Sequence, residues 1–475
     1  MDKTYEDVIN YFNEICKIPR GSKNEQAISN WIVELAKNDN LQVRQDEMFN
    51  VVVYKEPALG LENKERIILQ AHLDMVCEKV TESNHDFLKD EVKMLKYIED
   101  GREFIKADGT TLGGDDGIGV AILLALMLNN NIKMPGCYFI FTTQEEIGMY
   151  GAKALDFSDI DAKYLINLDS EEEDTATVGC AGGVNTIFTK KEELSPSANQ
   201  LFEIMISGLK GGHSGVDINK GRINANCLMA MILDRINDIQ ISSWFGGTKD
   251  NVICNNTKVV FSSDMIKEEI EDVIKTVINN MTFVDDDKEI KISLKEIEST
   301  SKVYSTVVSK DIIKLILNLK QNVIDMSTKI EGLVETSGNI GIVLVDDNEI
   351  KVNESIRSSV DTQKKYYADY NCKVAKSYGF ECEEEGEYPG WDVKINSKLQ
   401  GLYSQCYMKT HKGELPKILS IHAGLECGLF FQKNSSIDMI SIGPNLYDVH
   451  TPNERLDVES VEKLLNTLIE MINNI

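Results

Sequence analysis

The first part of the chain alternates between two spacings of apolar residues. Apolar side chains recur at helical spacing over 5–16 and 25–37, and a continuous apolar run over 117–128 indicates a buried helix. Short apolar runs that are typical of buried strands lie at 66–69, 137–143 and 164–168. Strands and helices in alternation predict a three-layer α/β domain with a mostly parallel central sheet.

The pattern changes after residue 184 and returns near residue 390. In between, strand-like runs lie at 201–206, 257–262, 289–294, 338–345 and 355–360, and helical stretches at 266–280, 308–319 and 362–378. Their order resembles two successive βαββα-type halves. We therefore expect a discontinuous domain, 1–184 and 390–475, interrupted by an inserted α+β domain, 185–389, with an internal duplication.

Length and composition limit the class of protein. At 475 residues the chain exceeds what one hydrophobic core usually serves, so two or more domains are expected. The formal net charge of −27 argues against nucleic-acid and anionic-membrane partners, which repel an acidic protein. The 10 Cys residues include no CxxC pair, which favours reduced thiols. Without a basic-then-apolar start or a membrane-length apolar run, a cytoplasmic protein is expected.

Acidic and imidazole side chains stand beside these predicted elements. They are His72 and Asp74, Asp115 and Asp116, Glu145 and Glu146, Asp169, and His450. Ligands of α/β sheets bind outside the carboxyl ends of the strands, where several of these side chains are expected. Imidazoles and carboxylates are the N/O donors that zinc-type ions bind, and hydrolases use such ions to make hydroxide near neutral pH. The sequence thus indicates a hydrolytic metalloenzyme.

The residue types also suggest a division of roles. Asp74 stands two residues after His72, so in an extended segment it can hold the imidazole in one tautomer. Capping the next helix needs only one residue of the Asp pair 115–116, so a carboxylate remains that can bridge two cations. In the Glu pair 145–146, one residue can bind metal while the other takes a proton from water. Each pattern alone is common, and helix capping or an acidic helix start is the simpler explanation.

Taken in order, the motifs resemble a known family. They are His-x-Asp at 72–74, Gly-Gly-Asp-Asp-Gly-Ile-Gly at 113–119, Thr-Gln-Glu-Glu-Ile-Gly at 143–148, Asn-Leu-Asp-Ser-Glu-Glu at 167–172 and Val-His-Thr-Pro-Asn-Glu at 449–454. The series is similar to that of the co-catalytic di-zinc metallopeptidases. More narrowly, it resembles the aminoacyl-histidine dipeptidases, also called cytosol non-specific or Xaa-His dipeptidases. The resemblance spans essentially the whole chain, including Gly-Leu-Lys-Gly-Gly-His-Ser-Gly at 208–215 and Ile-His-Ala-Gly-Leu-Glu-Cys-Gly at 421–428.

The resemblance implies a specific set of metal ligands. These are Asp115 as the bridge between two zinc ions, His72 and Asp169 on one ion, and Glu146 and His450 on the other. Glu145 would be the general base, and Asp74 would orient His72. A cis peptide is implied between Asp115 and Asp116. Co²⁺ or Mn²⁺ could replace zinc, because N/O ligands discriminate poorly among these ions.

The inserted domain would then act as a lid. By resemblance His213 supports the tetrahedral oxyanion and Arg357 grips the terminal carboxylate of the substrate. A β-turn and an exposed strand Arg are the simpler explanations of these two residues. Asn255 and Gly424 are weaker candidates for substrate contacts.

The implied activity is metal-dependent hydrolysis of unblocked dipeptides of broad specificity, including Xaa-His dipeptides. A related aminotripeptidase or N-acyl-amino-acid deacylase with the same di-metal core is the alternative. A non-catalytic metal-binding protein is a third hypothesis. Such a protein would be expected to lack a metal ligand or the general base, and this sequence has all of them. The expected partners are small peptide substrates and a second copy in a homodimer. In dimeric relatives the lid of the partner chain supplies side chains to the active site. In this chain, two similar lid halves could supply such side chains, His213 among them, from within the same chain.

Overall fold

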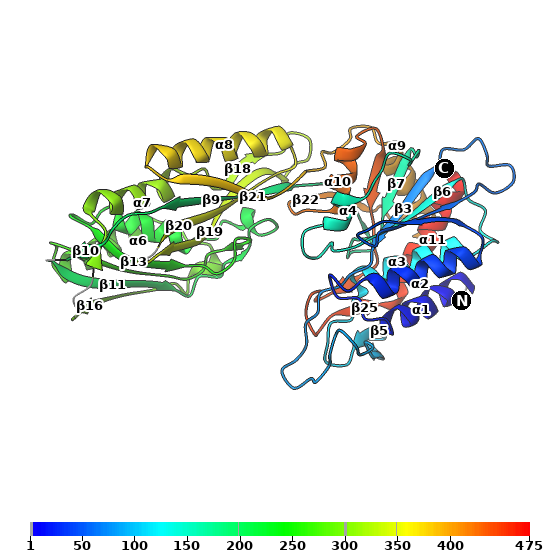
Figure 1. Cartoon of the computed structure of the whole chain (residues 1–475), viewed down its shortest axis with the longest axis horizontal. Coiled ribbons are helices and arrows are strands. Elements are labelled where there is room, and N and C mark those ends of the chain that lie inside the picture. The colour runs from blue at the N-terminus through cyan, green and yellow to red at the C-terminus, as the bar shows by residue number, and fades with distance from the viewer. Residues whose placement is uncertain (1–2, 198, 299–301, 348) are drawn as a thin grey trace. The chain divides into compact units, whose positions relative to one another are not determined.

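The computed structural model describes residues 3–475 except 198, 299–301 and 348, and these form two compact units (Figure 1). The larger unit comprises the residues up to Gly179 together with Asp392–Ser420 and Leu425–Ile475. The smaller unit comprises Cys180–Trp391 and Ile421–Gly424. The boundaries expected after residues 184 and 389 lie close to these divisions. The roles assigned to the two domains stay predictions.

The larger unit is built on an eight-stranded sheet with the order β1-β2-β6-β3-β7-β23-β8-β22. Its strands are β1 (Gln42–Gln45), β2 (Val51–Lys55), β3 (Ile67–His72), β6 (Cys137–Thr142), β7 (Tyr164–Asn167), β8 (Thr175–Cys180), β22 (Lys417–Ile421) and β23 (Asp438–Ser441). β3 pairs in parallel with β6 and β7, and β7 pairs in parallel with β23. The expected α/β fold with a parallel central sheet is therefore confirmed.

Helices cover this sheet (Figure 1). They are α1 (Lys3–Cys16), α2 (Gln26–Asn38), α3 (Gly114–Leu128), α4 (Tyr150–Ala154), α9 (Lys398–Thr410), α10 (Glu426–Lys433) and α11 (Val458–Asn474). Helices α1, α2, α3, α9 and α11 share one apolar core with Leu69 of β3 and Phe139 of β6. α3 has no polar side chain between Gly117 and Leu128, as expected for a helix that is buried on all sides.

A second, four-stranded sheet in the larger unit has the order β24-β25-β5-β4. Its strands are β4 (Met94–Glu99), β5 (Arg102–Ala107), β24 (Leu446–Tyr447) and β25 (Arg455–Asp457). β25 pairs with β5. The chain just before β25 is thereby held close to the segment that leads from β5 into α3, although the two are far apart in sequence.

The smaller unit contains an antiparallel sheet with the order β16-β11-β15-β13-β19-β20-β9-β21, in which β18 also pairs with β19. Its strands are β9 (Gly182–Lys190), β11 (Gln200–Ser207), β13 (Gln240–Gly246), β15 (Thr257–Ser263), β16 (Lys291–Ile297), β18 (Asn322–Met326), β19 (Val334–Val345), β20 (Ile350–Ser358) and β21 (Glu381–Tyr388). Two short ladders join β10 (Ser195–Pro196) to β17 (Lys302–Val303) and β12 (Gly212–His213) to β14 (Val252–Ile253). The separate antiparallel sheet confirms the inserted α+β domain, and the internal duplication stays a prediction.

Four helices pack on that sheet through one apolar core. They are α5 (Ala225–Leu233), α6 (Lys267–Asn279), α7 (Thr306–Asn318) and α8 (Asp361–Ser377), and two 3₁₀ turns lie at Ile218–Lys220 and Asp285–Asp287. Along β11, buried Ile204 and Ile206 alternate with Met205, which is 42% exposed. This alternation is typical of an antiparallel sheet with one covered face.

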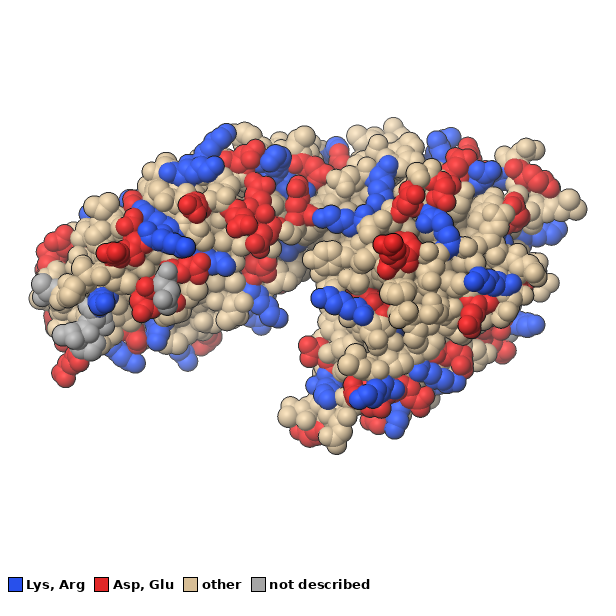
Figure 2. Space-filling model, viewed as in Figure 1, with Lys and Arg blue, Asp and Glu red and all other residues tan. Residues whose placement is uncertain are grey.

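Three further observations concern the residue types of the chain. The expectation of reduced thiols is wrong for Cys372 and Cys382, which form a disulfide with their Cα atoms 5.7 Å apart. On the face shown in Figure 2, Lys and Arg side chains lie interspersed with Asp and Glu side chains. In the whole sequence, 77 acidic residues stand against 50 Lys and Arg residues. Among the described residues, no helix has the length and apolar character needed to span a membrane.

Candidate metal centre

The acidic and imidazole side chains named in the sequence analysis converge at the carboxyl ends of the parallel strands. His72 ends β3, the pair Glu145–Glu146 lies in the turn after β6, and Asp169 follows β7 by two residues. Asp115 lies in the first turn of α3, and His450 lies in the loop between β24 and β25. The structure therefore brings together five segments from both ends of the chain.

Asp115 contacts both imidazoles. Its Oδ1 lies 3.0 Å from His72 Nε2, and its Oδ2 lies 3.0 Å from His450 Nε2. His450 Nε2 also lies 3.0 Å from Glu146 Oε2. One carboxylate thus stands between two groups of donors, which is the arrangement that a ligand shared by two cations requires.

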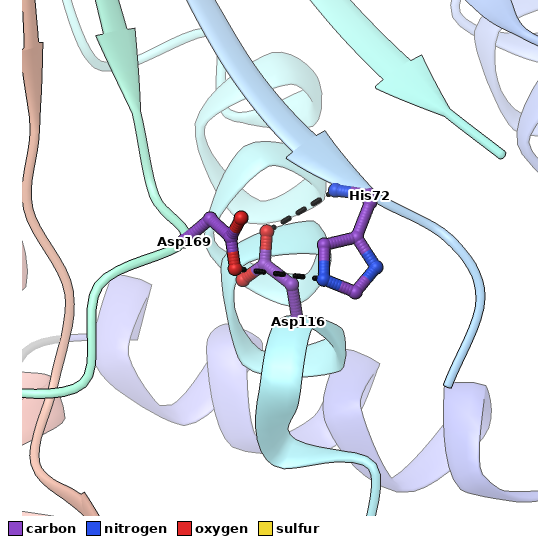
Figure 3. Close-up of side chains that lie close together, drawn as sticks. All are labelled: His72, Asp116 and Asp169. Atoms are coloured by element: carbon purple, nitrogen blue, oxygen red, sulfur yellow. Dashed lines mark hydrogen bonds and ion pairs between the residues drawn. The ribbon is translucent and has the colours of Figure 1, made fainter. Parts of the chain in front are cut away.

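The first group of donors is shown in Figure 3. Asp169 Oδ1 lies 3.5 Å from His72 Nε2, and the carboxylate of Asp116 accepts a hydrogen bond from the backbone N–H of His72 at 3.1 Å. Asp116 is buried, with 2% of its surface exposed, and this hydrogen bond fixes the position of the last residue of β3. The peptide bond between Asp115 and Asp116 is cis, as the resemblance implied.

Asp74 joins the end of β3 to the turn after β6. It is fully buried, and its Oδ1 lies 3.5 Å from His72 Nδ1. Its two carboxylate oxygens accept the backbone N–H of Glu145 at 3.0 Å and of Glu146 at 3.2 Å. Glu145 and Glu146 therefore lie in a turn and not in an extended strand. Asp74 fixes the imidazole and both glutamates relative to one another.

Glu454 and Arg20 hold the segment that carries Asp115, and the sequence argument missed both. The buried Glu454 carboxylate accepts hydrogen bonds from the four backbone N–H groups of residues 112–115, at 2.7 to 3.3 Å. Buried Arg20 donates to the carbonyl oxygens of Leu73, Asp74 and Gly113. Glu454 stands at the end of the Val-His-Thr-Pro-Asn-Glu motif. An acid four residues after the candidate ligand His450 was the feature of the sequence that could have identified it.

Burial and an excess of neighbouring carboxylates raise the pKa values of several groups in this cluster. Burial, with Asp115 and Glu146 adding to it, raises the pKa of Asp169 to about 6. Burial, followed by the Asp169 and Glu146 carboxylates, also raises the pKa of Glu145 well above its usual value. Hydrogen bonds with Asp115 and Glu146 raise the pKa of His450 to about 11. Divalent cations would displace these protons, because metal ligands bind in their deprotonated form.

The donor set fits a pair of divalent cations. Three overlapping groups of His, Asp and Glu side chains each have their donor atoms within 4.8 Å of one another. The members are His72, Asp116 and Asp169; His72, Glu145 and Glu146; and Asp115, Glu146 and His450. Nitrogen and carboxylate oxygen donors at such spacings suit zinc and similar ions. More candidate donors are present than one tetrahedral ion needs.

In the smaller unit, His213 lies on β12 at the end of the glycine-rich segment 208–215. Its Nδ1 accepts hydrogen bonds from the backbone N–H groups of Gly215 at 3.1 Å and Val216 at 3.2 Å. The neutral ring therefore carries its proton on Nε2. Burial and then the positive charge of Arg357 lower the pKa of His213, so the uncharged ring is favoured.

Arg357 is a buried cation of the same unit. It is 7% exposed, donates to Tyr388 Oη at 2.7 Å, and has no carboxylate partner among the described residues. Beside it lies His422, which the sequence argument did not assign and whose Nε2 lies 2.7 Å from Ser337 Oγ. Burial and then Arg357 lower the pKa of His422 to about 3. A buried guanidinium without an anion beside it is expected to bind one.

The weaker candidates lie nearby in the smaller unit. A Cβ atom at Gly211 would come 3.0 Å from Asn255 Cβ, and one at Gly215 would come 2.2 Å from the carbonyl oxygen of His422. The segment before and after His213 therefore packs closely against both residues. Gly424 ends the short segment that belongs to this unit.

Comparisons with known proteins identify the family of this chain. The profile of Peptidase family M20/M25/M40 matches residues 68–474. The cytosol non-specific dipeptidase of Escherichia coli (strain K12) is 36% identical over 98% of this chain and 96% of that protein. The crystal structure of aminoacylhistidine dipeptidase from Vibrio alginolyticus has a TM-score of 0.89 and 32% identity, covering 99% of this chain and 96% of that one. A Staphylococcus aureus tripeptidase, at 16% identity and TM-score 0.55 over 99% of this chain and 98% of that one, shares the fold.

The fold and the convergent donors define a metal-dependent hydrolase. The chain belongs to Peptidase family M20/M25/M40 and is a metallopeptidase.

Proposed function

We propose that this protein hydrolyses unblocked dipeptides with broad side-chain specificity, Xaa-His dipeptides included, and that it does so with two zinc ions per chain. The observation that carries the proposal is the position of Asp115, whose two carboxylate oxygens each lie 3.0 Å from a different imidazole. The names of the similar proteins from Escherichia coli and Vibrio alginolyticus support the substrate class.

Five side chains would hold the metal ions. The assignment is His72 and Asp169 on one ion, Glu146 and His450 on the other, and Asp115 on both. The contacts of Asp115 with the two imidazoles, and of Glu146 with His450, support this grouping. Zinc is the proposed ion, and Co²⁺ or Mn²⁺ could replace it at N/O donors.

Glu145 is the proposed general base. When bound, the metal pair would polarise the scissile carbonyl and lower the pKa of a water molecule toward neutrality. Glu145 would take the proton from that water and pass it to the nitrogen of the leaving amine. Burial raises the pKa of Glu145, which supports this role, because a more basic carboxylate takes up the proton of the water more readily.

Two groups of the smaller unit would bind the rest of the substrate. His213 Nε2–H would donate to the oxygen that becomes negative during attack, and the hydrogen bonds to its Nδ1 preset the required tautomer. The Arg357 guanidinium would bind the terminal carboxylate through charge-assisted hydrogen bonds. Asn255 and Gly424 remain predicted substrate contacts.

The test is a metal-replete assay against a panel of Xaa-His and other dipeptides, tripeptides and acetylated amino acids. We expect turnover of dipeptides with differing side chains, loss of activity with a chelator, and recovery with zinc. Faster turnover of tripeptides would indicate an aminotripeptidase, and faster turnover of acetylated amino acids a deacylase. Activity that survives complete metal removal would contradict the proposal.

Whether the protein is a monomer or a homodimer is tested separately. Light scattering gives the mass of one chain in the first case and about twice that mass in the second. Mixing His213→Ala with Glu145→Ala, each inactive alone, should restore activity only if one copy supplies His213 to the metal centre of the other.

A further inference from the structure

A row of uncharged polar side chains crosses the four neighbouring parallel strands of the larger unit's sheet. The row lies near the carboxyl ends of these strands, close to the proposed ligands. This polar row consists of Gln70 on β3, Thr142 on β6, Asn167 on β7 and Ser441 on β23, all with no exposed surface. Gln70 precedes His72 by two residues, so the two side chains lie on the same face of β3. Central parallel strands normally carry apolar side chains, and a buried polar row therefore calls for a reason.

The hydrogen bonds of the polar row all run in one direction. Ser441 Oγ donates to Asn167 Oδ1, and Asn167 Nδ2 donates to Gln70 Oε1 at 2.6 Å. Gln70 Nε2 then donates to Glu426 Oε2 at 2.6 Å, and Thr142 Oγ1 donates to the same oxygen at 2.7 Å. Asn167 Oδ1 also accepts the backbone N–H of Asp169 at 3.3 Å. Glu426 is thus the final acceptor of a chain that begins beside a proposed ligand.

Glu426 is the first residue of α10, which lies against the polar face of the sheet. The side chain has no exposed surface, and its Oε1 has no hydrogen-bond partner in the described part of the chain. Burial raises the pKa of this carboxyl to about 8. The uncharged acid is favoured because a buried ion without a partner is costly, and its proton would lie on Oε1, the oxygen that accepts no hydrogen bond.

We propose that Glu426 is a positioning residue of the metal centre, acting as a hydrogen-bond acceptor and not as a charge. By accepting from Gln70 and Thr142, it holds the ends of the strands that carry His72 and the Glu145–Glu146 turn. Through Gln70 and Asn167 it also restrains Asp169. The inference rests on the proposed metal centre, and it adds a residue that contacts none of the proposed ligands.

The test compares Glu426→Gln with Glu426→Leu. Glutamine presents a carbonyl oxygen to the same two donors, so its zinc dissociation constant should remain within about threefold of the wild-type value, as for a near-neutral replacement. Leucine removes the acceptor that Gln70 and Thr142 share and leaves them only the longer contacts, Gln70 Nε2 to Thr142 Oγ1 at 3.1 Å and Thr142 Oγ1 to the Ala71 carbonyl oxygen at 3.4 Å. Zinc affinity should fall roughly 10- to 100-fold, the usual effect of losing a group that orients ligands. Dissociation constants are measured by competition with a chromophoric chelator, and the visible spectrum of the Co²⁺ form reports the ligand geometry.

Glu354 provides the matched control. It is another fully buried carboxyl whose pKa burial raises to about 8, but it lies in the smaller unit and accepts from Asn371. Glu354→Leu should lower the melting temperature while leaving the zinc dissociation constant unchanged. Equal loss of affinity in Glu426→Gln and Glu426→Leu would show that charge matters and would overturn the proposal.

An unchanged affinity in Glu426→Leu would overturn the proposal as well. If that variant does not fold, Thr142→Val removes one donor to Glu426 with little change of shape. It should weaken zinc binding by roughly 5- to 10-fold, the effect of losing one neutral hydrogen bond, and a change below about threefold would again contradict the inference. Failure of the wild-type protein to bind two ions would instead refute the metal centre itself.

Discussion

Glu454 accepts a hydrogen bond from the backbone N–H of Asp115 at 3.3 Å. Four residues earlier in the same segment, His450 lies 3.0 Å from the carboxylate of Asp115. Residues 450–454 therefore contact both the main chain and the side chain of the proposed bridging residue. One short segment sets the position of a proposed ligand and contributes another.

Replacing Glu454 by Gln should weaken metal binding without unfolding the protein. The amide –NH₂ would face backbone N–H groups that now point at a carboxylate oxygen, so at least one donor would lose its acceptor. We expect zinc affinity to fall roughly 10- to 100-fold, by analogy with other groups that orient metal ligands. The zinc dissociation constant is measured by competition with a chelator. Glu459→Gln, an exposed change in the same part of the chain, is the control, and equal effects of the two variants would contradict the role of Glu454.

The two adjacent glutamates should respond differently to substitution. Glu145→Ala should keep both metal ions and reduce kcat by about 10²- to 10⁴-fold, because only proton transfer is lost. Glu146→Ala should instead reduce the bound metal, because it removes a proposed ligand. Elemental analysis after dialysis and steady-state kinetics separate the two effects. A Glu145→Ala variant with near-normal turnover would exclude this residue as the base.

Arg357→Ala should weaken the binding of peptides that have a free carboxyl terminus. The loss of a charge-assisted hydrogen bond costs about 1.5–3 kcal/mol, which corresponds to a rise in KM of roughly 10- to 100-fold. Dipeptide amides lack the carboxylate, so their kinetics should change little. Arg235→Ala, which alters an exposed residue of the same unit, is the control. A similar rise in KM for acids and amides would show that Arg357 does not bind the carboxylate.

Glu354 should make the stability of the protein fall as pH rises. Burial raises its pKa from 4.5 to about 8 in the folded state. The folded protein therefore keeps a proton that the unfolded chain releases, and stability is lost as pH rises between these two values, by at most about 1.4 kcal/mol per pH unit. Glu354→Gln does not titrate, so its melting temperature relative to wild type should rise from pH 5 to pH 8. A constant difference across that range would contradict the shifted pKa.

The secondary structure was most predictable where side chains pack on all sides. The apolar run 117–128 and the short run 164–168 coincide with α3 and β7, because complete burial requires continuous apolar sequence. β4 and β5 were not foreseen, since their mixture of exposed and buried residues carries no clear period. β9 runs across the expected boundary at 184, because its conformation depends on pairing with β20, more than 150 residues later.

The proposed ligands could be found because each stands at the end of a recognisable apolar element. Residues that support them could not be found in this way. Arg20, Glu426 and Glu454 act through partners far away in sequence, and Glu426 meets Gln70 across 356 positions. Nothing local distinguishes Arg20 or Glu426 from a charged residue at the surface, whereas the position of Glu454 in the His450 motif was a local signal.

Composition, periodicity and motif order by themselves determined the class of fold, the kinds of donor atoms and the family resemblance. These properties depend on local spacing, which the chain carries wherever it folds. Tertiary structure alone decided that Asp115 lies between His72 and His450 and that the acid pair 145–146 forms a turn held by Asp74. It also decided that Arg357 is a buried cation with no carboxylate partner in the part of the chain that the structure describes. Distances and burial arise when distant segments pack together, and a linear pattern does not contain them.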